Sequence, residues 1–305
     1  MDLDARKGGV LDAILAGYAN ELRQSGDENA TVTLAYTHSL HHSWRTFLRM
    51  LPFPPGRFVL DAGTGLGILA FELAANLPLH IDGIDITAGF VDHANTLLDR
   101  LDNVGFFMDG STIRFSEGDI RALAFPDRMF DLVVVREVLQ FLADPVQAVR
   151  EVLRVLRPGG YFCVSDTDDQ LRITWPPTSP VLEGLVAAVA AVQLERGGDR
   201  QSGRKLTTYL RSAGFEIATA VVLPEAQHRV VDAHDAERSL IVEQLHAART
   251  RVLEAGTMDA DRFDADLATL EQEPPFEEFR MNARIIVLGQ RPADPTKGPK
   301  RLHLF

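Results

Sequence analysis

Three glycines at alternate positions, Gly63, Gly65 and Gly67, follow Asp61 in the stretch RFVLDAGTGLGILAFELAANL. An apolar run precedes the aspartate and a helical pattern follows the glycines, so this loop joins a strand to a helix. Glycine accepts left-handed backbone conformations and lets another molecule approach the backbone closely. A dinucleotide-binding loop would carry its third glycine at position 68, which is Ile68 here. The loop therefore predicts a ligand other than NAD or NADP at the carboxyl end of the first strand.

Acidic and basic side chains end the strands that follow. Asp85 closes the run LHIDGID, where a carboxylate can accept hydrogen bonds from both hydroxyls of a ribose. The alternative is an acid that only stabilises the start of the next helix. Asp119 follows a third strand in EGDI, and Arg136 and Glu137 end the Val-rich run MFDLVVVRE.

The elements that must position these residues alternate along the chain. Short apolar runs are followed by helical patterns from Arg57 to Asp166, which is typical of βαβ units and a mostly parallel sheet. Two helical patterns precede this region, at about 10–24 and 39–51, and the polar stretch SGDENATV separates them. After it come helices at about 181–196 and 205–213, the strand FEIATAVVL, two further helices and the last strand FRMNARIIVLG.

The motifs VLDAGTGLG, IDGIDIT, FSEGDIRALAFPDRMFDLVVVREVLQFLADP and LRVLRPGGYFCVSD stand in this order. Together they resemble the landmarks of the class I S-adenosylmethionine-dependent methyltransferases. The resemblance is strong from about Phe58 to Asp166, and it continues more weakly through GGDRQSGRKLTTYLRSAGFEIATAVVL, which is similar to the small-molecule branch. It implies an α/β fold with a Rossmann-like, doubly wound, seven-stranded, mostly parallel sheet, and S-adenosyl-L-methionine as the cofactor.

The resemblance also implies roles for the acids. Asp85 would bind the ribose, with Ile86 beside it among the cofactor-binding residues. Asp119 would accept a hydrogen bond from the adenine amino group while Ile120 packs on the ring; the alternative is a plain turn aspartate. Asp61 would contact the methionine amino group, or it would only hold the glycine loop.

Arg136 would face the methionyl part of the cofactor. A second cation beside the sulfonium would be repelled, so its guanidinium would point to the cofactor's carboxylate or only its backbone would make contact. Methyl transfer needs a base only when the acceptor's proton is reluctant to leave, and the candidates are Glu137 and His38. His38 stands in YTHSLHHSW with His41 and His42. This helix face would point into the mouth of the cofactor site, or it would be a solvated face. No other cluster has ligand spacing, so we expect no metal.

The chain divides into three parts on this interpretation. Residues 1–56 form N-terminal lid helices, 57–291 form the cofactor-binding domain, and 292–305 form a flexible tail. Helical insertions interrupt the domain at about 170–198 and 232–273. The apolar stripes of the second insertion would line an acceptor pocket under a lid, or they would form only core: Leu240, Ile241, Leu245, Phe263, Leu267 and Leu270.

The composition limits the functions that remain. The net charge of -12 argues against sequence-independent nucleic-acid binding. No run reaches the length of a membrane span, and the first residues do not read as a signal peptide, so we expect a cytoplasmic protein. The single cysteine, Cys163, lies in a strand-like run. A homodimer is left open.

The leading hypothesis is a methyltransferase acting on O, N or C of a small, fairly apolar metabolite, in secondary metabolism. The alternative is an S-adenosylmethionine-binding enzyme of the same fold that catalyses a non-methylating cyclisation or rearrangement. A binding module without turnover is disfavoured because the glycine loop and both acids are intact. The sequence does not identify the acceptor.

Overall fold

The computed structural model describes residues 5–39, 57–232 and 234–293. The helices are α1 (Ala5–Ser25), α2 (Glu28–Ser39), α4 (Ile68–Asn76), α5 (Ala88–Asp102), α6 (Pro145–Val155), α7 (Pro180–Glu195), α8 (Leu206–Ala213), α9 (Ala236–Ala255) and α10 (Ala260–Glu271). Two short 3-10 helices span Leu139–Phe141 and Gly203–Lys205. The strands are β1 (Phe58–Ala62), β2 (His80–Asp85), β3 (Thr112–Glu117), β4 (Phe130–Arg136), β5 (Leu156–Asp166), β6 (Arg172–Trp175), β7 (Glu216–Val231) and β8 (Phe276–Gln290).

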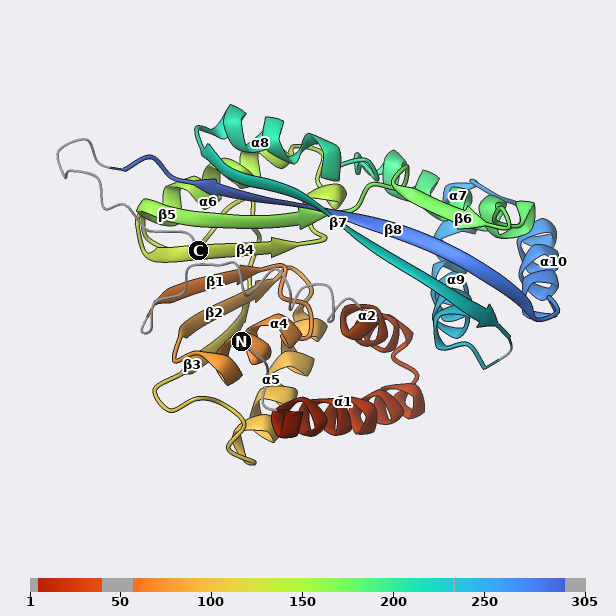
Figure 1. Cartoon of the computed structure of the whole chain (residues 1–305), viewed down its shortest axis with the longest axis horizontal. Helices are drawn as coiled ribbons and strands as arrows, with labels where there is room; N and C mark the ends of the chain where they lie inside the picture. Colours follow the sequence, from red (N-terminus) through yellow and green to blue (C-terminus); the bar gives the residue numbers. More distant parts are fainter. Residues whose placement is uncertain (1–4, 40–56, 233, 294–305) are drawn as a thin grey trace.

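In the described part of the chain, eight strands form one sheet in the order β3-β2-β1-β4-β5-β8-β6, and β7 also pairs with β8. Strands β1 to β5 pair in parallel, whereas β8 runs antiparallel to its three neighbours. Helices cover both faces of the sheet (Figure 1). This confirms the Rossmann-like class. The predicted count of seven strands was wrong, because β6 lies in RITWPPTSP and is recognisable only from its pairing with the distant β8.

The last two long strands project beyond the parallel strands (Figure 1). β8 pairs with β5 through residues 285–290 and with β6 through residues 279–282, and β7 follows β8 along its whole length. We call the projecting part the arm: β6, residues 224–231 of β7 and residues 276–283 of β8. The sequence predicted the β7 strand only to Leu223, because Pro224 and the polar residues at 225 and 227–229 interrupt the apolar run.

Helices α7, α9 and α10 pack on one another around a core of their own, and we call them the helical lobe. Four side chains from the predicted stripes are buried in this core: Leu245, Phe263, Leu267 and Leu270. Leu240 is also buried, and Ile241 packs against the same core. These stripes hold the lobe together and do not form an open pocket lining.

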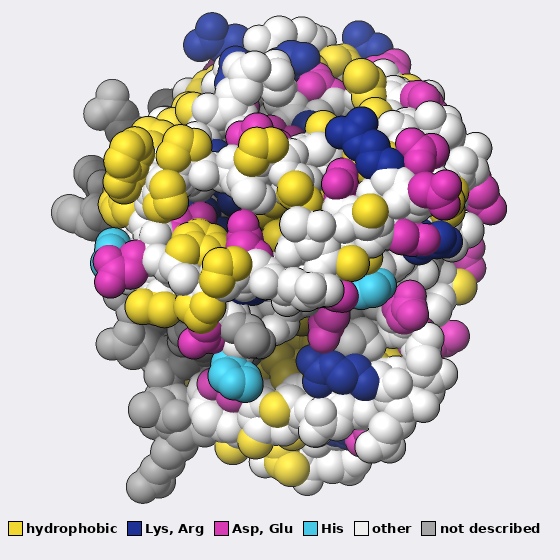
Figure 2. All heavy atoms as spheres, turned by 90° about the vertical axis from the view of Figure 1, so that its right-hand side faces the viewer, with side chains coloured by type: hydrophobic (Ala, Val, Ile, Leu, Met, Phe, Trp, Pro, Cys, Tyr) yellow, Lys and Arg dark blue, Asp and Glu magenta, His cyan; other side chains and the backbone are white. Residues whose placement is uncertain are grey.

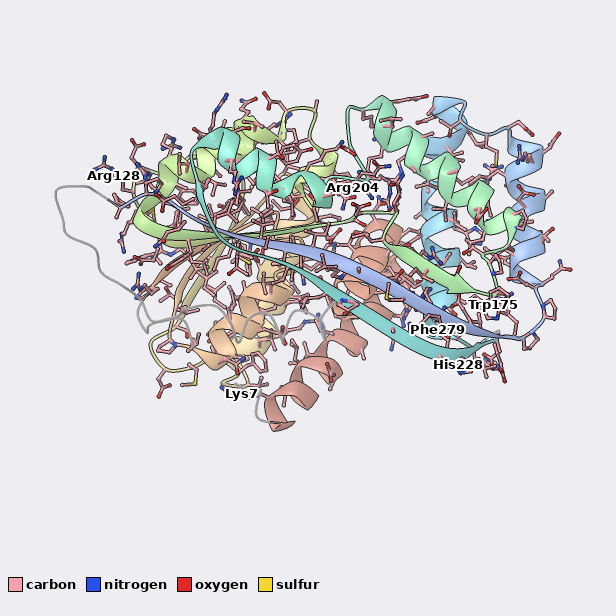
Figure 3. All side chains as sticks on the ribbon, turned by 45° about the horizontal axis from the view of Figure 1, so that its top comes forward. Lys7, Arg128, Trp175, Arg204, His228 and Phe279 are labelled. Atoms are coloured by element: carbon pink, nitrogen blue, oxygen red, sulfur yellow. The ribbon has the colours of Figure 1, made fainter. Side chains whose placement is uncertain are left out.

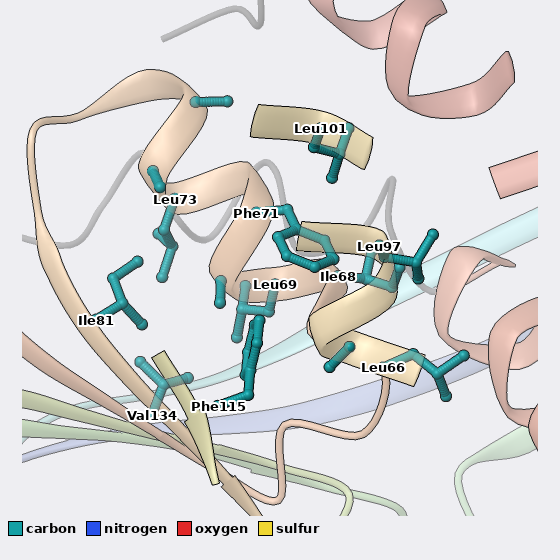
Figure 4. Packing of buried hydrophobic residues seen from close by; sticks show 14 of the residues in the cluster. Leu66, Ile68, Leu69, Phe71, Leu73, Ile81, Leu97, Leu101, Phe115 and Val134 are labelled. Carbon is teal, nitrogen blue, oxygen red and sulfur yellow. The ribbon is translucent and has the colours of Figure 1, made fainter. Parts of the chain in front are cut away.

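The main core on the α4 and α5 face fixes the glycine loop in place. Residues Ile68 to Ala75 of α4 are all buried. Figure 4 shows Phe71 of α4 beside Leu97 of α5 and Phe115 of β3, and Leu66 of the loop in the same cluster. A helix buried on all sides cannot shift without breaking this packing, so the loop at its start is held rigidly.

The N-terminal helices dock on α5 through polar contacts. The Tyr18 hydroxyl lies 2.6 Å from Nδ1 of His93, whose Nε2 lies 3.0 Å from the Asp27 carboxylate. Arg100 of α5 binds both carboxylate oxygens of Glu21, at 2.9 and 2.8 Å.

The position of α2 differs from the prediction. The stretch SGDENATV, expected to separate two helices, contains the start of α2, because the Asp27 carboxylate accepts the N–H of Ala30 and caps the helix. The helix predicted at 39–51 lies outside the described residues, apart from Ser39 at the end of α2.

Candidate functional site

The glycine loop turns between β1 and α4 with its three glycines in left-handed conformations. Their φ angles are 81° at Gly63, 55° at Gly65 and 81° at Gly67. The N–H groups of Gly63 and Thr64 both donate to the carbonyl oxygen of Ile84, at 2.8 and 2.9 Å. These bonds tie the loop to β2, so the ends of the first two strands form one rigid edge.

Two of the glycines are explained by packing within the protein. A Cβ at Gly63 would lie 2.2 Å from Cγ2 of Val138, and a Cβ at Gly67 would lie 2.6 Å from Cζ of Phe115. Either contact is too short for a real side chain. Both positions therefore need glycine whether or not a ligand binds.

Gly65 is different because the space beside it is open. Among the described atoms, a Cβ at Gly65 would have Thr33 of α2 as its nearest neighbour, at an ordinary 3.8 Å. The Gly65 N–H donates to Oδ2 of Asp85 at 2.9 Å, and the Thr87 N–H donates to Oδ1 of the same carboxylate at 2.9 Å. The structure thus brings together the predicted glycine and the predicted ribose-binding acid. Ile86, the next residue, is 61% exposed, so an apolar side chain lies open there.

Asp119 has a partner that the sequence analysis did not consider. Its carboxylate accepts hydrogen bonds from the Arg121 guanidinium, the shortest at 2.6 Å, and from the Arg121 backbone N–H at 2.8 Å. These hydrogen bonds hold the pKa of Asp119 below its ordinary value. Ile120 is only 6% exposed and belongs to the core on the α6 and α8 face, so little of its side chain is open to a ligand.

Asp61 is buried, with its Oδ2 accepting a hydrogen bond from the Thr64 hydroxyl at 2.7 Å. This contact holds the glycine loop, which is one of the two roles considered for Asp61. Burial raises the pKa of Asp61 from 3.8 to about 6, and the Thr64 hydrogen bond and the charge of Arg136 oppose that rise. Removal from water lowers the pKa of Arg136, and the charges of Asp61 and Glu137 oppose this change. Asp61 and Arg136 therefore share one poorly hydrated environment.

Glu137 follows β4 in a left-handed conformation, with φ 57°, which is unusual for a residue with a side chain. Its Oε1 accepts a hydrogen bond from Nη1 of Arg284 at 2.9 Å, and its Oε2 accepts one from Nε2 of Gln140 at 2.9 Å. Burial raises the pKa of Glu137, and the charge of Arg284 is the main opposing effect. The sequence analysis missed Arg284, although an arginine just before the apolar run IIVLG was a signal.

Gln140 connects Glu137 to a second buried acid. The Gln140 N–H donates to Oδ2 of Asp166 at 2.8 Å, and the Ser202 hydroxyl donates to the same oxygen at 3.2 Å. Burial and then the charge of Glu137 raise the pKa of Asp166 well above its ordinary value. The side chain of Gln193, on α7, donates to the Gln140 carbonyl at 2.9 Å. These contacts fix the turn that presents Glu137.

The histidine candidates are only partly described. His38 lies in the last turn of α2, while His41 and His42 lie outside the described residues. Residues 294–305 of the predicted tail also lie outside them. Within residues 5–39, 57–232 and 234–293, no group of three His, Cys, Asp or Glu side chains has a metal-binding arrangement. In the same residues, no helix is long and apolar enough to cross a membrane.

Known proteins are similar to this chain in sequence. Residues 60–164 match the family described as methyltransferase domain. The chain is 32% identical over 164 residues to a protein of Mycolicibacterium smegmatis named probable S-adenosylmethionine-dependent methyltransferase, covering 53% of each. It is 32% identical over 202 residues to 27-O-demethylrifamycin SV methyltransferase of Amycolatopsis mediterranei, covering 63% of this chain and 71% of the relative.

Matched regions span about half the length of the first two curated relatives. Among solved structures, a SAM-dependent methyltransferase from Methanosarcina mazei is 17% identical with a TM-score of 0.52, covering 82% of this chain and 98% of that one. At this identity the likeness concerns the fold.

Proposed function

The chain belongs to the class I S-adenosylmethionine-dependent methyltransferases, and from this premise we propose that it methylates O, N or C of a small, fairly apolar metabolite, in secondary metabolism. The observation that carries the proposal is the open, left-handed Gly65, whose N–H is bonded to the Asp85 carboxylate at 2.9 Å. At this strand end a ligand can lie against the backbone and reach a carboxylate.

The cofactor-binding residues are assigned as follows in this proposal. Asp85 binds the ribose hydroxyls, because each of its oxygens accepts one backbone N–H and retains a further lone pair. Ile86 lies exposed beside it and covers the adenine. Asp119 accepts the adenine amino group while keeping its contact with Arg121. Ile120 supports this region from the core.

Asp61 and Arg136 serve the methionyl end in this proposal. Asp61 stabilises the methionine ammonium, and Arg136 stabilises the methionine carboxylate. The charge of each side chain opposes the pKa shift of the other, which supports a shared site for the two groups. The backbones of Gly63, Gly65 and Gly67 complete the site.

S-Adenosylmethionine supplies a methyl group on a positively charged sulfur. The chain's own task is to hold the acceptor in line with that group and to exclude water, and such positioning can account for about 7 to 11 kcal/mol of a barrier. Glu137 is our proposed base for an acceptor that must lose a proton. Its side chain is 9% exposed, and burial has raised its pKa, so it has a stronger affinity for a proton than an exposed glutamate. His38 on α2 is the second candidate.

The cover of the site comes from two parts of the chain in this proposal: the N-terminal helices and the helical lobe. Thr33 of α2 lies beside Gly65, and α2 also contacts α9 of the lobe. Arg23 of α1 lies 3.9 Å from Glu243 of α9. These contacts support a lid formed by residues 1–56 together with the insertions at 170–198 and 232–273.

A homodimer is part of the proposal. The outward face of the arm exposes large apolar side chains: Trp175 at 71%, Val230 at 57%, Ile173 at 55% and Phe279 at 39%. Figure 3 shows Trp175, Phe279 and His228 close together on the arm. In Figure 2, hydrophobic side chains gather on the left-hand side of the view. In the part of the chain that the structure describes, the outer edge of β7 has no pairing strand. A second copy related by a two-fold axis would cover both features.

Mass spectrometry with methyl-labelled S-adenosylmethionine tests the catalytic proposal. Incubation with a panel of hydroxylated and amino metabolites should give S-adenosylhomocysteine together with a labelled product. Conversion of an acceptor without S-adenosylhomocysteine would indicate a cyclisation or rearrangement and contradict methyl transfer. Light scattering tests the dimer, which should dissociate in Trp175→Asp without loss of the fold. A monomeric wild type would contradict it.

A further inference from the structure

The arm is polar on the face that points into the molecule. Along β8, the side chains of Glu278, Arg280 and Arg284 share one face because side chains alternate along a strand. Glu278 and Arg280 are 7% and 2% exposed, whereas Phe279 between them is 39% exposed. Packing alone favours the opposite arrangement, with apolar side chains inside. Hydrophobic packing therefore does not explain the polar inner face of the arm.

Arginines on this face hold carboxylates of the protein. Arg284 binds Glu137 at 2.9 Å, and Arg280 binds Glu237 of α9. Arg229, opposite Glu278 on β7, binds Asp235, Glu237 and Glu278 at 2.8 to 3.0 Å.

Arg172 of β6 is the exception. It lies on the same face as these arginines, because it pairs across the strands with Asn282, two residues from both Arg280 and Arg284. Within the described residues, no hydrogen bond or ion pair involves its guanidinium. The nearby carboxylates of Glu278 and Glu237 already bind Arg229 and Arg280. Five N–H donors of Arg172 are thus available to another molecule.

The surroundings of Arg172 favour such a molecule. Loss of water around the guanidinium, and then the positive charge of Arg280, lower the pKa of Arg172, while Glu278 and Glu237 oppose this change. Arg172 is also exposed at the surface of the arm, so a ligand can reach its guanidinium, and a ligand that supplies oxygen atoms would form charge-assisted hydrogen bonds with it.

The position of Arg172 relates it to the reacting centre. Its partner Asn282 is two residues from Arg284, which is about 7 Å along a strand. Arg284 in turn binds Glu137, the proposed base at the end of β4. A molecule that reaches from Glu137 along the inner face of the arm therefore meets Arg172 next.

We propose that the acceptor carries a carboxylate and that Arg172 binds it through two parallel N–H···O bonds. This rests on the proposed function and specifies its substrate class: an amphipathic acid, with its reacting atom near Glu137 and its carboxylate at Arg172. Within the described residues, the neighbouring Arg280 and Arg284 already bind carboxylates, so the Arg172 guanidinium matches one negative charge, which favours a carboxylate over a phosphate dianion.

Calorimetry in the presence of saturating S-adenosylhomocysteine tests the proposal. The probes are phenylacetate, 4-phenylbutanoate and decanoate, each compared with its primary amide, and phenyl phosphate. At least one carboxylate should bind wild type about 10-fold or more tightly than its amide, the scale of a hydrogen bond to a charged group. Arg172→Ala should remove this preference, and Arg172→Lys should retain part of it. Arg211→Ala, an exposed arginine on α8, is the matched control and should behave as wild type.

Several results would overturn the proposal. These are a wild type that binds no carboxylate of the panel, a wild type that binds acids and amides equally, or a preference that survives in Arg172→Ala. Tighter binding of phenyl phosphate than of every carboxylate would indicate that the ligand of Arg172 carries a phosphate and not a carboxylate. S-Adenosylhomocysteine is titrated first, so that failure of the proposed function can be distinguished from failure of this proposal. If it does not bind, the proposed function is contradicted. If it binds and one of the results above is found, only the assignment of Arg172 is contradicted.

Discussion

The substitution Asp61→Asn tests two effects of the buried Asp61 charge: its effect on the stability of the protein and its effect on cofactor binding. Asp61 is 2% exposed, its carboxylate accepts a hydrogen bond from Thr64, and burial raises its pKa from 3.8 to about 6. The folded state therefore holds a proton on Asp61 more tightly than the unfolded state does. Its contribution to the free energy of unfolding is most favourable below pH 3.8 and declines as the pH rises to about 6.

The size of that decline follows from the pKa change. A difference of about two pKa units corresponds to about 3 kcal/mol at neutral pH. Asparagine has the shape of the carboxyl group without its charge, so the apoprotein should gain about 3 kcal/mol of stability at pH 7.5, and about half as much at pH 5. For a chain of this length, 3 kcal/mol corresponds to a rise in melting temperature of about 5 °C.

Urea denaturation of the apoprotein at pH 5 and pH 7.5 measures this gain, with the exposed Asp92→Asn on α5 as control. The same substitution should weaken S-adenosylmethionine binding, because the methionine ammonium loses its counter-charge, and affinity should no longer rise with pH around 6. If the Asp61→Asn variant is no more stable than wild type at pH 7.5, the claim that burial of the Asp61 charge destabilises the protein is refuted. A gain in stability with unchanged cofactor affinity would leave Asp61 only its role in holding the loop.

Other parts of the site and the lobe give sharp expectations. Asp85→Ala should weaken S-adenosylmethionine binding by about 1.5 to 3 kcal/mol, the scale of hydrogen bonds to a charged group; unchanged affinity by calorimetry in a folded variant would place the ribose elsewhere. Gly65→Ala should remain folded, at a cost of about 1 to 2 kcal/mol for its left-handed backbone, and yet lose cofactor affinity, whereas Gly67→Ala should lose more stability because its Cβ would meet Phe115. Equal effects of the two substitutions on thermal unfolding and on binding would contradict the distinction. Leu245→Trp should lower the free energy of unfolding by about 1 to 3 kcal/mol through overpacking of the lobe, and altered acceptor choice at normal stability would show that Leu245 lines a pocket after all.

The parallel half of the fold could be predicted because its signals are local. Strands β1 and β4 contain short apolar runs and β3 alternates apolar with polar residues, and the acids at or just after the strand ends stand in the same stretches of sequence. Asp85 and Gly65 were both identified, and their hydrogen bond follows from two neighbouring strands ending at one edge.

The remaining features depend on contacts between distant segments. β6 has four residues and exists through its pairing with β8. The contact between Glu137 and Arg284 joins positions 147 residues apart, and no periodicity predicts it. The glycine pattern alone could not show that Val138 and Phe115 account for two of the three glycines, because that needs the positions of their side chains.

Titration of the wild-type protein with S-adenosylhomocysteine and, separately, with NADH is the most direct test of the central claim. We predict that S-adenosylhomocysteine binds with one molecule per chain and that NADH gives no measurable heat, because the loop at Gly65 and Asp85 lacks the glycine that a pyrophosphate needs at Ile68. NADH binding with comparable affinity, or no binding of S-adenosylhomocysteine to the folded protein, would contradict the account.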